Sequence, residues 1–195
     1  MIPLAVLRHG PTLWNESKHI QGQRDIPLSE KGRRTVRSWR LPPELRGRAW
    51  WASTLGRARE TAALLGLPAP RLDPRLMELH WGTWEGERRP DLIARLGDTW
   101  TAQEAAGFGF QTLGGESFAD LRDRLTAFLL ELGRRGEPAG VVCHRGVIRV
   151  LYAMATGWDM RPPEPERLRN GCLHEFTLDE DGRPSLVRLN LSLAA

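Results

Sequence analysis

Short apolar runs alternate with amphipathic segments along most of the chain, a pattern typical of strands that alternate with helices. Six segments carry the strand signal, because they are short and apolar or rich in β-branched and aromatic residues: 3–7, 49–52, 71–76, 139–143, 172–178 and 185–191. The last two flank Asp179-Glu180-Asp181-Gly182, which predicts a hairpin. The runs 3–7 and 139–143 are each followed by a histidine, either directly or after one residue.

Helical segments lie between these runs. Apolar spacing and capping residues predict helices over about 29–40, 57–65, 117–132 and 144–155. Ser29 and Ser117 are the candidate N-caps, and Gly66 and Pro68 end the second helix. The stretch 79–115 is loop-rich, and its aromatic residues are spread among short helical pieces. We therefore expect this stretch to form a cap that sets substrate specificity.

Alternating strands and helices predict an α/β fold, a three-layer α/β/α sandwich around a mostly parallel sheet. The length of 195 residues favours one domain, 1–195, with one sizeable core. In such folds ligands bind at the carboxyl ends of the strands. His9, Ser53 and His144 all follow or end predicted strands. We therefore expect these three segments to meet at one edge of the sheet.

Composition narrows the setting of the protein. Hydrophobic residues make up 41% and charged residues 27%, which excludes a disordered chain. Neither a leader pattern nor an apolar run long enough for a membrane span is seen, so we expect a cytoplasmic protein with no membrane partner. The two cysteines, Cys143 and Cys172, lack metal-ligand spacing and are expected to be reduced. The net charge of +4 favours anionic partners weakly.

Arg8-His9-Gly10 combines groups that phosphoryl chemistry needs. A phosphate monoester is a dianion, so a neutral nitrogen attacks it only where cations and amide donors neutralise and orient it. Histidine suits covalent phosphoryl transfer because one ring nitrogen attacks while a hydrogen bond holds the other. Alone, however, this tripeptide does not distinguish an active site from a structural histidine at a strand end.

Four further groups of residues follow it in order. The group that begins with Arg8-His9-Gly10 continues through Thr12, Trp14-Asn15, Gln21-Gly22, Asp25, Pro27-Leu28 and Glu30-Lys31-Gly32-Arg33. The four further groups are Ser53-Thr54-Leu55-Gly56-Arg57-Ala58 with Thr61-Ala62, Glu78-Leu79 with Gly82 and Trp84-Glu85-Gly86, Gly114-Gly115-Glu116-Ser117, and His144-Arg145-Gly146-Val147-Ile148-Arg149. This series resembles the histidine phosphatase superfamily, the phosphoglycerate mutase-like fold. The resemblance covers most of the chain.

The resemblance implies a role for each matched residue. His9 is the nucleophile that becomes a phosphohistidine, and Glu78 is the proton donor. The phosphoryl oxygens are expected to be bound by Arg8, Arg57 and a protonated His144, with neutral donors from Asn15, Gln21 and Gly22. No metal and no cofactor are implied. Pro11 departs from the family, which usually has an acidic or amide residue there, and removes one backbone N–H from the loop.

The resemblance also bears on the reaction. A mutase must exclude water, whereas a phosphatase admits it. The compact stretch from Glu78 to His144 and the short apolar tail 189–195 look more like the phosphatase branch, which includes broad-specificity and α-ribazole phosphatases. We therefore expect hydrolysis of a small phosphorylated metabolite such as α-ribazole 5'-phosphate. A phosphoglycerate mutase is the alternative.

Other interpretations remain open. A noncatalytic binder of phosphate ligands or nucleic acid is a remote alternative, but no contiguous basic stripe favours nucleic acid. For His19, His80 and His174 we expect structural roles, and the tryptophans are expected to pack in the core and the cap, although Trp81 or Trp84 could touch substrate. A homodimer is left open.

Overall fold

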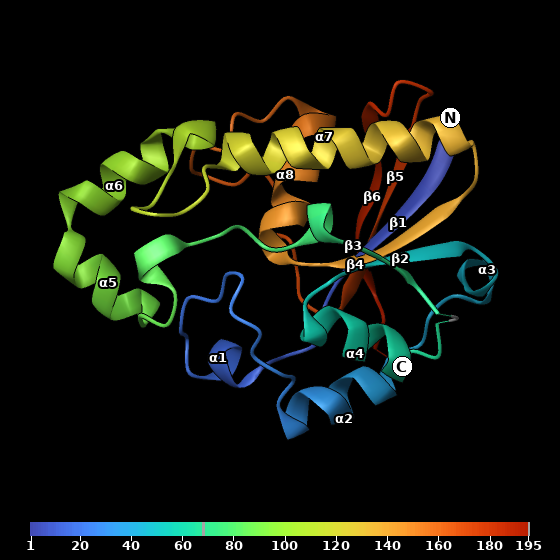
Figure 1. The fold of residues 1–195 in the computed structure, drawn as a ribbon, viewed down its shortest axis with the longest axis horizontal. Helices are drawn as coiled ribbons and strands as arrows, with labels where there is room; N and C mark the ends of the chain where they lie inside the picture. The colour runs from blue at the N-terminus through green and yellow to red at the C-terminus, as the bar shows by residue number, and fades with distance from the viewer. Residues whose placement is uncertain (68, 195) are drawn as a thin grey trace.

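A six-stranded sheet lies between two layers of helices in the computed structural model, which describes residues 1–67 and 69–194 (Figure 1). The strands are β1 (Ile2–Arg8), β2 (Ala49–Ser53), β3 (Arg71–Asp73), β4 (Ala139–Cys143), β5 (Cys172–Leu178) and β6 (Pro184–Ser192). Their order in the sheet is β3-β2-β4-β1-β5-β6. The first four pair in parallel, while β5 and β6 form the predicted antiparallel hairpin. The mostly parallel α/β/α sandwich is confirmed.

Strand β1 shows why the sheet lies in the middle. Leu4 and Val6 contribute to one hydrophobic core, and Ala5 and Leu7 contribute to another. Successive side chains of a strand point to opposite faces, so an uninterrupted apolar run is buried on both. The run therefore requires helices above and below the sheet.

Within residues 1–67 and 69–194, eight α-helices supply these layers and the cap. They are α1 (Leu13–Glu16), α2 (Glu30–Ser38), α3 (Pro43–Arg46), α4 (Gly56–Leu64), α5 (Arg89–Leu96), α6 (Asp98–Ala105), α7 (Phe118–Arg135) and α8 (Arg145–Thr156). In Figure 1, α7 and α8 lie on one side of the sheet and α2 and α4 on the other. The expected caps are confirmed, because Ser29 accepts a hydrogen bond from Gly32 and Ser117 forms a capping box with Asp120.

Two predicted boundaries need correction. The expected strand 71–76 ends at Asp73, because Pro74 lacks the N–H that a continuing strand would use and begins a 3-10 turn, Pro74–Leu76. The first predicted helix ends at Ser38. Pro68, expected to help end the second helix, and Ala195, the end of the predicted tail, lie outside the described residues.

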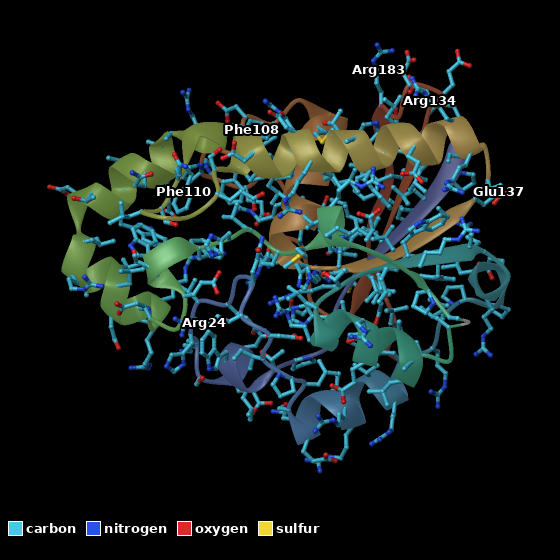
Figure 2. All side chains as sticks on the ribbon, in the orientation of Figure 1. Arg24, Phe108, Phe110, Arg134, Glu137 and Arg183 are labelled. Carbon is cyan, nitrogen blue, oxygen red and sulfur yellow. The ribbon has the colours of Figure 1, made fainter. Side chains whose placement is uncertain are left out.

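The stretch 79–115 forms a lobe beside the sheet, made of α5, α6 and the 3-10 turns Gly82–Trp84 and Gly107–Gly109 (Figure 1). Its interior is aromatic: Trp84 stacks on Trp100 at 5.4 Å between ring centroids, and Phe110 meets Trp81 edge to face at 5.5 Å. Figure 2 labels Phe110 inside this lobe and Arg24 on the loop beside it. The lobe reaches the sheet through Phe118, at the start of α7.

Within the described residues, every helix is either too short or too polar to span a lipid bilayer.

Candidate active site

His9 and His144 are brought together by the pairing of two parallel strands. Arg8, the last residue of β1, lies opposite Cys143, the last residue of β4. The histidines that follow therefore leave the sheet side by side, and the His9 N–H donates to the Cys143 carbonyl at 3.0 Å. The ring centroids of His9 and His144 lie 5.1 Å apart. The prediction that separate strand ends deliver polar groups to one edge is confirmed for this pair.

The His9 ring is held in one tautomer. Its Nδ1 lies 2.7 Å from the Gly10 carbonyl oxygen, which can only accept a hydrogen bond, so Nδ1 carries the proton. Nε2 then carries the lone pair. Burial lowers the pKa of His9 well below its ordinary value of 6.5, and the guanidiniums of Arg8 and Arg57 lower it further. The ring is therefore neutral and nucleophilic at neutral pH.

His144 lies beside His9 and is fully buried. Neither of its ring nitrogens has a hydrogen-bond partner among the described residues. Burial lowers the pKa of His144 well below 6.5, and Arg57 and His9 add to the effect. This lowered pKa argues against the expected protonated His144, because the surrounding cations and the loss of solvent both disfavour a further positive charge. One neutral N–H remains for an incoming anion.

Arg8 directly precedes His9 in the chain and supplies a positive charge beside its ring. One of its terminal nitrogens donates to Asn170 Oδ1 at 2.6 Å, and its buried Nε has no partner among residues 1–67 and 69–194. Burial lowers the pKa of Arg8 to about 10, with Glu78 opposing the shift. The guanidinium stays charged at neutral pH. A buried cationic N–H and unpartnered imidazole nitrogens are groups that an anion would satisfy.

Arg57, in the first turn of α4, is fully buried and is held by the loop 21–25. Its terminal nitrogens donate to the carbonyls of Gly22 at 2.6 Å and Arg24 at 2.9 Å. In the amide orientation that satisfies both neighbours, Gln21 donates to Thr12 Oγ1 and accepts from Arg57 at 3.1 Å. Burial lowers the pKa of Arg57, and Glu78 is the largest opposing influence.

Gln21 and Gly22 therefore act differently from the prediction that both are neutral donors to the phosphoryl oxygens. Gln21 lines the site, but its amide is used to position Arg57 and Thr12. Gly22 is not among the residues that line the cavity and instead offers its carbonyl to Arg57. A Cβ there would lie 2.0 Å from Glu85 Oε1, so the backbone approaches this carboxylate too closely for a side chain.

Glu85 is a site residue whose role the sequence did not reveal. Its buried carboxylate accepts hydrogen bonds from the backbone N–H groups of Gln23 at 2.8 Å, Arg24 at 2.9 Å and Trp81 at 3.1 Å. It thus fixes the loop whose carbonyls hold Arg57. The only signal was its place in the motif Trp84-Glu85-Gly86, which does not predict burial.

Glu78 lies at the start of the cap segment and is almost completely buried. Its Oε1 accepts from the N–H of Leu79 at 2.8 Å and of Gly146 at 3.0 Å, and its Oε2 accepts from Gly146 at 3.2 Å. Arg124 donates to the Glu78 carbonyl at 3.1 Å and is itself paired with Glu116 at 2.6 Å. The carboxyl group is therefore anchored to α8, and the backbone behind it to α7.

One solvent-open cavity of about 390 Å³ joins these groups. Five of the predicted site residues line it: Arg8, His9, Asn15, Gln21 and Glu78. The other polar and charged groups on its wall are Lys18, His19, Arg89, Arg145, Arg149 and Asn170. Arg57 and His144 lie buried behind His9, close enough to influence its electrostatics. The volume is near the lower end for ligand sites, which suits a small molecule.

The other histidines, His19, His80 and His174, lie in different environments. The structural role expected for His174 is confirmed, since it is buried in β5 and accepts from the Asn190 N–H at 3.3 Å. His19 lines the cavity, but its Nδ1 lies 2.7 Å from Ser17 Oγ and its ring lies 5.8 Å from Trp14, so its structural role stays a prediction. His80 is half-exposed and lies 3.9 Å from Glu85. Trp81 lines the cavity, as one alternative allowed.

The geometry combines a nitrogen nucleophile, a carboxyl group and several cations in or beside one cavity. A neutral imidazole with a free Nε2 is suited to attack a phosphorus atom, and buried guanidiniums are suited to hold its oxygens. In the described part of the chain, no group of three or more His, Cys, Asp or Glu side chains is placed to hold a metal ion.

Comparison with known proteins gives a consistent picture. Residues 4–192 match the model of the histidine phosphatase superfamily (branch 1). The chain is 34% identical to phosphoglycerate mutase-like protein 4 of Arabidopsis thaliana, over 90% of this chain and 79% of the relative, and 32% identical to a metal-independent phosphoserine phosphatase of the same plant, over 78% and 68%. It superimposes on mycobacterial glucosyl-3-phosphoglycerate phosphatase in complex with VO3 with a TM-score of 0.80, at 27% identity and full coverage of both chains.

Proposed function

The chain belongs to the histidine phosphatase superfamily (branch 1), and from this premise we propose that it hydrolyses small phosphomonoesters through a covalent phosphohistidine on His9. The observation that carries the proposal is the bond from His9 Nδ1 to the Gly10 carbonyl, which leaves Nε2 as a free lone pair beside the unpartnered nitrogens of His144 and Arg8. These are the groups that a phosphoryl transfer site requires.

In the first step His9 Nε2 attacks phosphorus and the bond from phosphorus to the ester oxygen breaks. Glu78, in its carboxylic acid form, gives its proton to the leaving oxygen, so that an alcohol departs. Of its two oxygens, Oε2 accepts the single, longer backbone bond, so Oε2 is the oxygen with room for this proton. Arg8, Arg57 and a neutral His144 N–H stabilise the charge on the phosphoryl oxygens.

In the second step water attacks the phosphohistidine. Glu78, now a carboxylate, takes a proton from the water as its oxygen bonds to phosphorus, and the bond from phosphorus to Nε2 breaks. Inorganic phosphate leaves and both residues return to their first state. The opening of the cavity to solvent supports this step, because water must reach the intermediate.

A brief reaction with a radiolabelled monoester, quenched in alkali, tests the mechanism. Alkali preserves phosphohistidine, so the label should be recovered on His9 in the wild type and be absent in His9→Ala. With p-nitrophenyl phosphate, kcat of His9→Ala should fall by about a thousandfold or more, as for other lost nucleophiles. An active, properly folded His9→Ala protein would exclude the proposal. Chelators should leave the wild-type activity unchanged, whereas strong inhibition would indicate metal-assisted hydrolysis.

A phosphoglycerate mutase is the second candidate, because several relatives are named phosphoglycerate mutase-like or probable phosphoglycerate mutase. Residues 184–194 favour hydrolysis, since none of them lines the cavity that holds Glu78 and Leu193 is bonded to Arg40 and Gly171 instead. Interconversion of the phosphoglycerate isomers with bisphosphoglycerate, and little phosphate release, would identify a mutase. Whether the substrate is α-ribazole 5'-phosphate, whether the chain dimerises and whether it is cytoplasmic stay predictions, as does the role of 79–115 in specificity.

A further inference from the structure

Two cavities meet at His9, and only one of them contains Glu78. The second, of about 460 Å³, is lined by Trp39 and Cys172 among others. The two share the lining residues Arg8, His9, Asn15 and Asn170. In the proposed reaction Glu78 protonates the leaving oxygen, so this oxygen lies on the side of Glu78. The alcohol portion of the substrate therefore occupies the first cavity, and the side chains of that cavity define its chemistry.

Three arginines line the first cavity in addition to the catalytic groups. Arg145 and Arg149 lie one turn apart on α8, so they share one face of the helix, and Arg89 begins α5 in the lobe opposite. Lys18 lines the same cavity. The wall thus carries four cations besides Arg8.

The carboxylates near these arginines are fewer than the arginines themselves. One carboxylate, Glu164, is shared by Arg145 at 3.1 Å and Arg149 at 3.3 Å. Glu104 lies 3.4 Å from Arg89. Among the described residues these are the only carboxylates within 4.0 Å of the three guanidiniums. The cluster therefore keeps an excess of positive charge facing the cavity.

Aromatic rings hold two of the guanidiniums in place. Arg149 lies over Phe118 at 5.4 Å and over Trp158 at 5.2 Å from the ring centroids, and Arg89 lies over Trp100 at 4.7 Å. Little side-chain entropy is then lost when a ligand binds them. Such preorganised planar donors suit the oxygens of an anion.

The charges are also close enough to repel each other. Burial is the main cause that lowers the pKa of Arg149, Glu164 opposes it, and Arg145 and Arg89 lower the pKa further. The pKa of Arg89 is likewise lowered by burial first, against Glu104, and then by Arg145. A bound anion would relieve this repulsion.

We infer that the alcohol portion of the substrate carries a second anionic group, a carboxylate or a second phosphate, which is bound by Arg89, Arg145 and Arg149. The inference rests on the proposed function, because Glu78 as proton donor places the alcohol portion in this cavity. Neutral phosphomonoesters are then poor substrates of the same enzyme.

Matched ester pairs test the inference. The carboxylate arm compares 2-phosphoglycolate with its neutral amide, and the phosphate arm compares propane-1,3-diol bisphosphate with the monophosphate. The wild type should favour the anionic member of at least one pair in kcat/KM by about tenfold to a hundredfold, the range that one or two charge-assisted hydrogen bonds give. The arm with the larger ratio identifies the anion. p-Nitrophenyl phosphate reports the basic hydrolase activity.

Arg145→Gln and Arg149→Met should each reduce this preference to within about threefold of unity, because kcat/KM falls much more for the anionic member than for the neutral one. Arg149→Met keeps an unbranched stem over Phe118 and Trp158, and Arg145→Gln, at a more exposed position, serves if Arg149→Met fails to fold. Arg59→Gln, on an exposed position of α4, is the control and should retain the full preference.

Equal rates for both members of both pairs in the wild type would overturn the inference and leave the proposed function intact. So would variants that slow both members equally, since the arginines would then bind the phosphoryl group itself. If no ester, including p-nitrophenyl phosphate, were hydrolysed, the proposed function would fail and the inference with it.

Discussion

Hydrogen bonds to the backbone decide what the catalytic side chains of this protein can do. The Gly10 carbonyl fixes which nitrogen of His9 carries the proton, and the Gly146 N–H fixes the carboxyl group of Glu78. Both partners belong to segments that directly follow the two central strands. The reacting atoms are thus oriented by main-chain groups, which substitutions nearby do not remove unless the backbone or the space beside it changes.

Gly146→Ala is expected to lower kcat by about a hundredfold or more, because it removes the space that Glu78 occupies. A Cβ at Gly146 would lie 2.2 Å from Glu78 Oε1, so the carboxyl group must move away from the cavity. General acid and base catalysis contributes about 10²- to 10⁴-fold in enzymes. Steady-state kinetics with p-nitrophenyl phosphate measures the effect.

Gly47→Ala is the matched control, because its added Cβ would meet nothing within 4 Å and its φ of −83° suits alanine. It should keep wild-type activity. Equal activities of the Gly146 and Gly47 variants would contradict the placement of Glu78 as the proton donor.

At the scale of elements, the loop 21–25 is the part that builds the phosphate end of the site. Three hydrogen bonds attach this loop to its neighbours. The Glu85 carboxylate accepts from the Gln23 N–H, Asp25 accepts from the Gly56 N–H at the start of α4, and the Gln23 side chain donates to the Glu78 carbonyl. Arg57 is held by two carbonyls of this loop. The loop, rather than α4 alone, therefore determines where the guanidinium lies.

Glu85→Gln should weaken phosphate binding although Glu85 does not line the cavity. An amide cannot accept hydrogen bonds through both ends, so one N–H of Gln23, Arg24 or Trp81 would face an NH₂ group. The free energy of unfolding should fall by about 2 kcal/mol, and inhibition by inorganic phosphate should weaken about tenfold. Urea denaturation and product inhibition measure the two effects.

Glu87→Gln provides the comparison, since this half-exposed carboxylate pairs only with Arg95 at 3.1 Å among the described ion pairs. Its loss should change the stability by less than about 0.5 kcal/mol. If Glu85→Gln reduced stability without any change in phosphate inhibition, Glu85 would hold the loop without positioning Arg57.

The sequence predicted those parts of the site that local patterns determine. Uninterrupted apolar runs identified the strands before His9 and His144, and the motifs placed Glu78 and Arg57. The burial of a side chain and its hydrogen-bond partners depend on elements distant in the chain, so no local sequence pattern predicts them. For this reason Glu85, a polar residue in a loop segment, was not predicted to be a buried hydrogen-bond acceptor. Gly22 was predicted to contact the phosphoryl oxygens, whereas its carbonyl accepts a hydrogen bond from Arg57.

At the scale of the whole molecule, three histidines are buried in their neutral form. Burial lowers the pKa of His174 to about 4, and the pKa values of His9 and His144 lie well below 6.5. Between these values and 6.5 the unfolded chain binds protons that the folded chain does not bind. The free energy of unfolding therefore decreases as the pH falls below 6.5.

At pH 5.5 the expected loss is on the order of 1 kcal/mol for each histidine, so it is a few kcal/mol for the three together. Urea denaturation at pH 7.5 and 5.5 measures it. Saturating inorganic phosphate should reduce the loss, because an anion beside His9 and His144 raises their pKa. A stability that is constant over this range, with or without phosphate, would contradict the neutral burial of these rings.

The sheet order has a consequence for the synthesis of the chain. Strand β1 is made first, yet its two neighbours, β4 and β5, are the strands Ala139–Cys143 and Cys172–Leu178. While the ribosome translates the intervening residues, the apolar β1 segment has neither of its strand partners, and an unpaired apolar strand is prone to associate with other chains. The nascent polypeptide thus passes through a long interval in which its N-terminal segment depends on chaperones or on transient collapse for protection.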